Sequence, residues 1–245
     1  MVLGSLLGCG SQLGGLDPRT PLFVVSPCGG DPVAAEEVVA LTLQGGVTPI
    51  YPGVELPPLD LAAFRIPGGR TLADDPRAFR QAVAERISRI FCESGSIPLS
   101  VVWADEIDPD SAPPGVTVHF TQSLAPDGGD QVGQGEYDVC NRQHDNVALV
   151  YGERLRRLAG VQSFEDWGAM FANVAAHEVA HALGYGHVPR GQGDGDTPER
   201  PLYVELMLDG HTLAELRQAQ RIVTPQDTCP TQRRWLSRRR YPTIP

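Results

Sequence analysis

Apolar residues recur at helical spacing in two stretches of this chain. Between Asp75-Pro76, a typical helix start, and Gly95 they fall every three or four positions, which predicts an amphipathic helix. The stretch after Ser163 is apolar on every side, which predicts a long buried helix. Helix-capping patterns open this helix and a final one, namely Ser163 with Asp166 and Thr212 with Glu215.

Shorter apolar runs predict β-strands. We expect four of them, at residues 22–25, 99–104, 116–120 and 147–151. Residues 34–43 fit either a helix or a strand. The proline-rich stretch 45–69 should be extended or looped, and the Gly- and Asp-rich stretch 127–138 should be a loop.

The proline-rich stretch also indicates a domain boundary near residue 60. We divide the chain into a leader at 1–20, an N-terminal extension at 21–60, a main domain at 61–228 and a basic tail at 229–245. Helices and strands follow one another irregularly in the main domain, which predicts the α+β class.

Composition excludes two classes of protein. The chain has 245 residues and a formal net charge of −10, which argues against nucleic-acid binding. No run reaches the roughly 18 apolar residues of a membrane span, so we expect no transmembrane segment. The hydrophobic fraction of 41% is ordinary for a folded globular protein.

The cysteines give indications of the cellular compartment of the protein. Leu6-Leu7-Gly8-Cys9 looks like a bacterial lipobox, in which Cys9 would carry a lipid anchor, but no basic residue precedes it. Either the true start lies upstream or the likeness is chance. The other four cysteines would allow two disulfides in an oxidising compartment, and Cys92 with Cys140 is the pairing we favour.

One stretch carries a metal-binding pattern. Residues His177 to His187 read H-E-x-x-H-x-x-G-x-x-H, so His177 and His181 lie one helical turn apart on one face. Gly184 can adopt a positive φ, so the chain can end the helix there and turn back. This turn would bring His187 close to the first two histidines as a third ligand. Three imidazoles suit one Zn²⁺ and leave its fourth position open, as in catalytic zinc sites.

Glu178 follows the first ligand and points about 100° around the helix from it. We predict that it is the general base, which takes a proton from water and passes it to a leaving amine. Two histidines at this spacing can also occur on a helix for solubility alone. The full five-position pattern is expected by chance with a probability on the order of 10⁻⁵, which favours the metal interpretation.

This motif resembles that of the metzincin clan of zinc endopeptidases, and we describe the chain as matrixin-like. In that clan a downstream Met-turn underlies the zinc histidines, and Met207 in Leu206-Met207-Leu208 matches it. The alternative is a methionine that fills the core.

The resemblance implies a fold for residues 61–228. It is a catalytic domain with a twisted mixed sheet and two long helices in an upper subdomain, and a small irregular lower subdomain that ends in a helix. The resemblance also implies that substrate lies extended along an edge strand. For this strand we take Val147, Ala148, Leu149, Val150 and Tyr151.

The chain departs from the clan at several positions. Val188 follows the third ligand, where matrixins have Ser and astacins Glu. Asp209 lies two residues after Met207, so the extra Tyr ligand of astacins is not expected. His119 and His144 do not reproduce the ligand set of the second, structural zinc in matrixins, so we take them as ordinary hydrogen-bonding histidines.

Two segments have two interpretations each. Residues 193–196, Gly-Asp-Gly-Asp, form a plain solvated loop, or they shape the specificity pocket or bind Ca²⁺, for which the sequence offers no further support. Cys28 is a disulfide partner, or it is the thiol of a matrixin-type cysteine switch, although the Arg that normally precedes that Cys is absent. In the second case residues up to about 55 form a propeptide.

These observations predict a zinc-dependent endopeptidase with one catalytic Zn²⁺. We expect a monomer that acts on a protein or peptide substrate and is secreted or held in the bacterial cell envelope. Two alternatives remain open, a non-catalytic zinc-binding module of the cell envelope and a zinc hydrolase that cleaves a non-peptide amide.

Overall fold

The computed structural model describes the central part of the chain, at residues 37–94, 99–106, 115–138, 142–143, 145–188, 204–207, 210–218 and 220–222. Several predictions fall outside the described residues, namely the leader with Cys9, the strand at 22–25, Cys28, His144, the loop at 193–196 and the basic tail.

A five-stranded sheet forms the centre of the molecule, in the order β4-β1-β5-β7-β6. Its strands are β1 (Glu37–Thr42), β4 (Leu99–Trp103), β5 (Val116–Thr121), β6 (Gly133–Gly135) and β7 (Asn146–Tyr151). The first four in this order pair in parallel, and β6 pairs with β7 antiparallel. The protein therefore has a mixed α/β architecture with a mainly parallel sheet, and the strands predicted near 99, 116 and 147 are confirmed.

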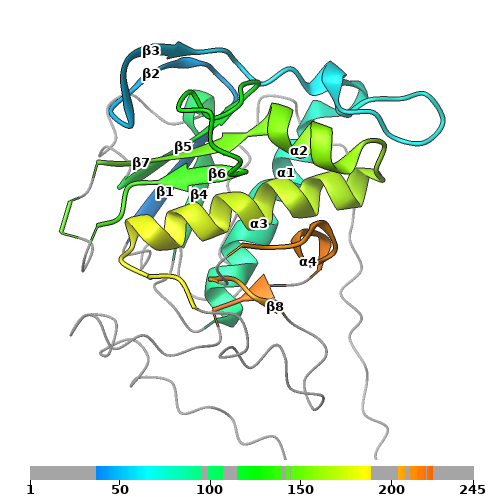
Figure 1. Cartoon of the computed structure of the whole chain (residues 1–245). Coiled ribbons are helices and arrows are strands. Elements are labelled where there is room, and N and C mark those ends of the chain that lie inside the picture. The colour runs from blue at the N-terminus through cyan, green and yellow to red at the C-terminus, as the bar shows by residue number, and fades with distance from the viewer. Residues whose placement is uncertain are drawn as a thin grey trace, which may run out of the picture.

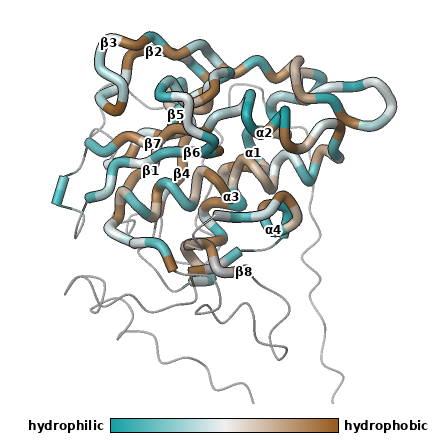
Figure 2. The backbone as a smooth tube through the Cα atoms, in the orientation of Figure 1, coloured by the Kyte–Doolittle hydropathy of each residue, from teal (hydrophilic) through white to brown (hydrophobic). Residues whose placement is uncertain are grey.

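The two predicted long helices, α1 (Pro76–Glu93) and α3 (Phe164–Ala182), cover one face of this sheet (Figure 1). Each begins at its predicted cap, because the Asp75 side chain accepts from the Ala78 N–H and the Ser163 hydroxyl accepts from the Asp166 N–H. Hydrophobic segments meet between the strands and α3, whereas the outer loops are more hydrophilic (Figure 2).

The other face of the sheet carries a smaller apolar cluster. A hairpin of β2 (Gly46–Thr48) and β3 (Tyr51–Leu56) lies above the sheet in Figure 1. It brings Leu56 against Val147, Leu149 and Tyr151 of β7. Since the hairpin belongs to the proline-rich stretch 45–69, the prediction of an extended segment is confirmed there.

The predicted boundary near residue 60 needs correction. β1 precedes it, yet this strand lies inside the sheet between β4 and β5, with Val39 and Leu41 fully buried in the core. Of the two structures that residues 34–43 allowed, the strand is the one formed. Residues 37–60 therefore belong to the same folded unit as the residues after them, and removal of residues 1–55 would take a core strand away.

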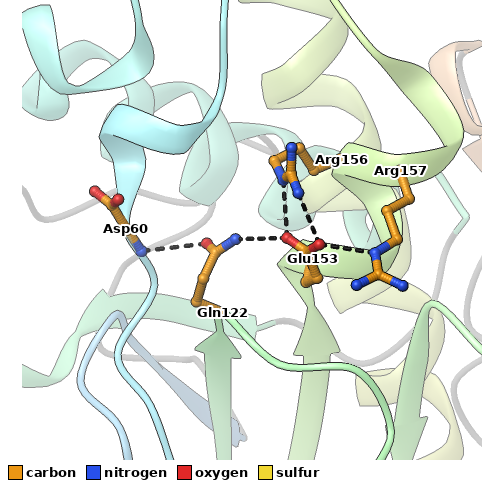
Figure 3. A network of polar contacts seen from close by, with 5 residues as sticks. All are labelled: Asp60, Gln122, Glu153, Arg156 and Arg157. Carbon is orange, nitrogen blue, oxygen red and sulfur yellow. Dashed lines mark hydrogen bonds and ion pairs between the residues drawn. The ribbon is translucent and has the colours of Figure 1, made fainter.

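A short helix, α2 (Gly152–Ala159), was not predicted from the sequence. Glu153 in its first turn accepts hydrogen bonds from Arg156 and Arg157, and from the Gln122 amide after β5 (Figure 3). The Gln122 amide oxygen in turn accepts from the Asp60 N–H at 3.4 Å (Figure 3). This network ties α2 to the proline-rich segment and to the end of β5.

The C-terminal described segments pack below α3 (Figure 1). They comprise β8 (Val204–Glu205), α4 (Leu213–Arg217) and β9 (Gln220–Arg221), and the Thr212–Glu215 capping box predicted for the final helix is present. Fully buried Asn173 of α3 holds them, because its amide donates to the carbonyl oxygens of Leu216 and Gln218 at 2.8 and 2.9 Å.

Two further sequence predictions concern the covalent structure and the membrane. Cys92, near the end of α1, is disulfide-bonded, and its partner lies outside the described residues, so the pairing with Cys140 stays a prediction. Among the described residues no helix has the length and apolar character that crossing a bilayer requires.

Candidate metal centre

Three histidine nitrogens converge at the end of α3. The Nε2 atoms of His177, His181 and His187 form a triangle in which each side measures 3.1 Å. The first two histidines come from α3 and the third from the segment after it. Within the described residues this is the cluster that could hold a metal ion.

The other ring nitrogen of two of these histidines is engaged by a backbone carbonyl. His177 Nδ1 lies 2.7 Å from the Leu206 oxygen, and His181 Nδ1 lies 2.8 Å from the Tyr185 oxygen. A carbonyl oxygen only accepts, so each Nδ1 carries the proton and each neutral ring directs an Nε2 lone pair into the triangle.

Neutral rings are also what the surroundings favour. Burial lowers the pKa of His177 well below its usual value, and the neighbouring histidines lower it further. Burial lowers the pKa of His181 as well, and His187 contributes. Two lone pairs 3.1 Å apart repel each other unless a cation lies between them, so the arrangement is one that could hold a metal ion.

The geometry of the donors fits zinc. Zinc–nitrogen bonds of about 2.0–2.1 Å at tetrahedral angles place ligand nitrogens about 3.3 Å from one another. The observed separations of 3.1 Å are close to this value. His187 is exposed, so the cluster is in contact with solvent at this ligand. The donor chemistry and the spacing both suit a borderline cation such as Zn²⁺.

The end of α3 explains how the third histidine returns. The Tyr185 N–H donates to the Ala180 carbonyl and the Gly184 N–H to the His181 carbonyl, which is the Schellman pattern. Gly184 has φ of 90°, as predicted, because an L side chain rarely adopts this conformation. The same turn supplies the Tyr185 carbonyl that orients His181, so helix termination and ligand orientation share one local structure.

Glu178 lies beneath the edge strand β6. The carboxyl group is buried, with 7% of the residue exposed, and burial raises its pKa to about 8. The Gly135 backbone N–H donates to it and opposes this shift. A cation held by the histidines would also favour the carboxylate form.

Two glycines allow β6 to approach α3 this closely. A Cβ atom at Gly133 would lie 2.6 Å from the Glu178 Oε1 atom, and one at Gly135 would lie 2.7 Å from the Glu178 backbone oxygen. Real Cβ atoms do not approach neighbours at such distances, so a side chain at Gly135 would push the two backbones apart, and one at Gly133 would displace the side chains of Glu178 and Val174.

The prediction that Val147, Ala148, Leu149, Val150 and Tyr151 form the substrate edge strand is wrong. These residues lie in β7, which pairs with β5 on one side and with β6 on the other. The edge is β6, within the stretch 127–138 that we expected to be a loop. Its glycines, needed for contact with α3, give no strand signal in the sequence.

Met207 is fully buried and belongs to the main core. Its carbonyl accepts from the Val188 N–H at 2.7 Å, so it is bonded to the residue that follows the third histidine. Leu206, the residue before it, supplies the carbonyl that orients His177. Met207 thus lies directly beside the segments that hold two of the histidines.

Sequence reasoning missed two residues beside the cluster. The Tyr137 ring, half-exposed after β6, lies 6.1 Å from the His181 ring, and the His211 ring lies 5.6 Å from the His177 ring. The closeness of His211 in the sequence to Met207 and to the capping box could have indicated its place near the cluster, but nothing in the sequence pointed to Tyr137.

His119, which we took as an ordinary hydrogen-bonding histidine, lies on β5. It bonds to the Gln44 backbone there, and burial lowers its pKa.

Comparisons with models of protein families, with characterised proteins and with solved structures found no match to this chain. The fold and the site thus define a mixed α/β protein with three converging histidines at the end of α3, the longest helix in the described part of the chain.

Proposed function

We propose that this protein is a zinc-dependent endopeptidase. One observation carries the proposal, namely that three imidazole nitrogens lie 3.1 Å from one another next to a buried carboxyl group that is bonded to β6, the edge strand of the sheet in the described part of the chain. His177, His181 and His187 hold the metal. When bound, zinc supplies Lewis-acid chemistry that activates water and polarises a carbonyl group.

Strand β6 provides the place for an extended peptide. Val132 and Glu136 exchange backbone hydrogen bonds with β7, at 2.9 and 3.1 Å. Because an antiparallel strand alternates its bonding direction, the backbone groups of Gly133 and Gly135 point away from β7, toward the side where no described strand pairs with β6. On that side the Gly135 N–H donates to Glu178, which leaves the Gly133 N–H and the two glycine carbonyl oxygens for an added strand. A peptide that adds to this edge as a further strand gains main-chain hydrogen bonds.

The Glu178 carboxyl group is well placed for proton transfer at that edge. Since the Gly135 N–H donates to it, a peptide added along β6 would have its backbone next to this carboxylate. We assign Glu178 the role of general base, with an oxygen of its carboxylate accepting a proton from water and delivering it to the leaving amine nitrogen. Such catalysis contributes about 10²–10⁴-fold.

The resemblance to the metzincin clan supports the same proposal, and a matrixin-like catalytic domain is its finer form. The pattern from His177 to His187, the buried Met207 and the mixed sheet with two long helices agree with it. The disulfide at Cys92 supports secretion or residence in the cell envelope, where thiols oxidise. A protein or peptide is the proposed substrate.

Cleavage of a mixed peptide library by the full chain, loaded with zinc, tests this proposal. Wild type should cleave, and Glu178→Gln should lose about 10²–10⁴-fold in kcat while still binding one zinc. Exposed Glu55 on β3 offers a matched control, so Glu55→Gln should cleave as wild type does. Zinc binding without peptide cleavage by wild type would reject the proposal and favour the binding module or a hydrolase of another amide.

A further inference from the structure

His211 lies against the metal centre but is not one of its ligands. Its ring centroid is 5.6 Å from that of His177, and the two rings are nearly perpendicular at 86°. The three ligand nitrogens lie within 4.8 Å of one another, and His211 does not belong to that group. The partly buried His211 ring therefore packs against a ligand ring without joining the ligand group.

The position of His211 is fixed by its neighbours in the chain. Gly210, with φ of 72°, makes the turn before it, and Thr212 after it is the N-cap of α4. The Thr212 N–H donates to the Glu215 carboxylate at 2.6 Å and the Thr212 hydroxyl accepts from the Glu215 N–H. His211 therefore lies between the turn at Gly210 and the hydrogen-bonded N-cap Thr212.

The segment that carries His211 is in turn tied to α3. Asn173 donates to the carbonyl oxygens of Leu216 and Gln218, and its amide oxygen accepts from Arg86 Nε at 2.9 Å. Asn173 lies one helical turn before His177 on α3, so one helix positions both the ligand and the element that presents His211. A side chain supported in this way has the preorganisation that a catalytic group needs.

We propose that His211 is a further catalytic residue, which donates a ring N–H hydrogen bond to the carbonyl oxygen of the scissile peptide as negative charge develops on it. The inference rests on the proposed endopeptidase function. Donors preorganised at a developing oxyanion lower the barrier, and one of them is typically worth about 10²–10³-fold in kcat.

Two substitutions of His211 distinguish hydrogen-bond donation by its ring from packing of the ring against His177. His211→Phe keeps an aromatic ring against His177 but has no donor, and His211→Gln keeps an N–H donor without the ring. We expect His211→Phe to lower kcat by about 10²-fold with KM changed by less than about threefold. His211→Gln should be about tenfold more active than His211→Phe. His119→Phe, a histidine substitution on β5, is the matched control and should leave kcat/KM unchanged.

Two further readouts do not depend on turnover. A phosphinic peptide carries a tetrahedral anionic group like the transition state, so its Ki should rise in His211→Phe by the factor by which kcat/KM falls. The Kd of an uncleaved peptide should be equal in Glu178→Gln and in the double variant Glu178→Gln, His211→Phe, because the ground state lacks the oxyanion. Each variant should bind one zinc.

The outcomes are distinguishable. If wild type cleaves peptides and His211→Phe does so equally well, the inference is wrong and the proposed function stands. The inference is also overturned if the loss appears only in KM or in side-chain preference, which would make His211 a pocket wall, or if zinc affinity falls, which would make it a support for His177. If wild type cleaves no peptide, the proposed function fails and this role fails with it.

Discussion

His177 Nδ1 and the Leu206 carbonyl oxygen lie 2.7 Å apart, although 29 residues separate them in the chain. This hydrogen bond fixes the imidazole in the form whose Nε2 lone pair faces His181 and His187. Because Leu206 directly precedes the buried Met207, the C-terminal segment determines how the first ligand is presented. The metal centre and the packing of that segment are therefore coupled.

Metal binding should raise the stability of the fold. Zinc at about 100 times its Kd adds about 2.7 kcal/mol to the free energy of unfolding, which corresponds to a rise in Tm of about 5–10 °C. His187 is exposed, so His187→Ala should fold and lose this rise. Thermal unfolding in zinc and in chelator measures it, with His119→Ala as a control that keeps the rise. Equal Tm values of wild type in zinc and in chelator would contradict the expectation.

Gly135→Ala should disturb the contact between β6 and α3. The new Cβ would lie 2.7 Å from the Glu178 backbone oxygen, so we expect a loss of about 1–3 kcal/mol in the free energy of unfolding and reduced peptide cleavage.

Gly168→Ala in α3 is the matched control for this substitution. Its Cβ would lie 3.6 Å from that of Ala82, an ordinary contact, and alanine favours a helix, so stability should rise by about 0.5–1 kcal/mol. Urea unfolding followed by circular dichroism compares the two variants. If Gly135→Ala proves as stable as wild type, the proposed close approach of β6 to α3 is incorrect.

Asn173→Ala should loosen the C-terminal segment. It removes three hydrogen bonds of a fully buried side chain, one from Arg86 and two to the carbonyl oxygens of Leu216 and Gln218, at an expected cost of about 2–4 kcal/mol. Arg86→Met keeps the two bonds from the Asn173 amide to the carbonyl oxygens but also removes the bond from Arg86 to the Gln218 carbonyl oxygen, so it should cost less than Asn173→Ala while loosening the segment somewhat. Hydrogen exchange should show faster opening around α4 in Asn173→Ala than in Arg86→Met, and equal exchange in both variants would argue against Asn173 as the main anchor.

Glu153 should make stability depend on pH in acid. Its hydrogen bonds from Arg156 and Arg157 lower the pKa of Glu153 from 4.5 to about 2, so the folded state favours the carboxylate. The stabilisation is fully present above about pH 4.5 and is lost as the pH falls through about 2. Both arginines are partly exposed, so we expect about 1–2 kcal/mol near neutrality and about half of that at pH 3.

The difference in unfolding free energy between wild type and Glu153→Gln, measured from pH 6 to pH 3 in metal-free protein, tests this expectation. Chelation removes the separate effect of pH on histidine ligands. Exposed Glu55 serves as the comparison, since Glu55→Gln should show a small difference that does not shrink in the same way. A difference between wild type and Glu153→Gln that stays constant over this range would refute the assignment.

Local patterns in the sequence were sufficient for the features that depend on neighbouring residues. The caps at Asp75 and Ser163 and the positive φ of Gly184 follow from side-chain hydrogen bonding and backbone sterics within a few residues. The same holds for the pattern from His177 to His187, because helical spacing alone places its first two histidines on one face.

Long-range packing decided what the sequence did not reveal. Strand β6 forms because Gly133 and Gly135 let it pass over Glu178, although glycine by itself disfavours a strand. β1 belongs to the core because it pairs with β4 and β5 on either side, across the proline-rich segment. Leu206 and His211 contact His177 only because the chain folds back beneath α3. The motif therefore predicts the three histidines, whereas the residues that contact them from distant parts of the sequence are set by the tertiary structure.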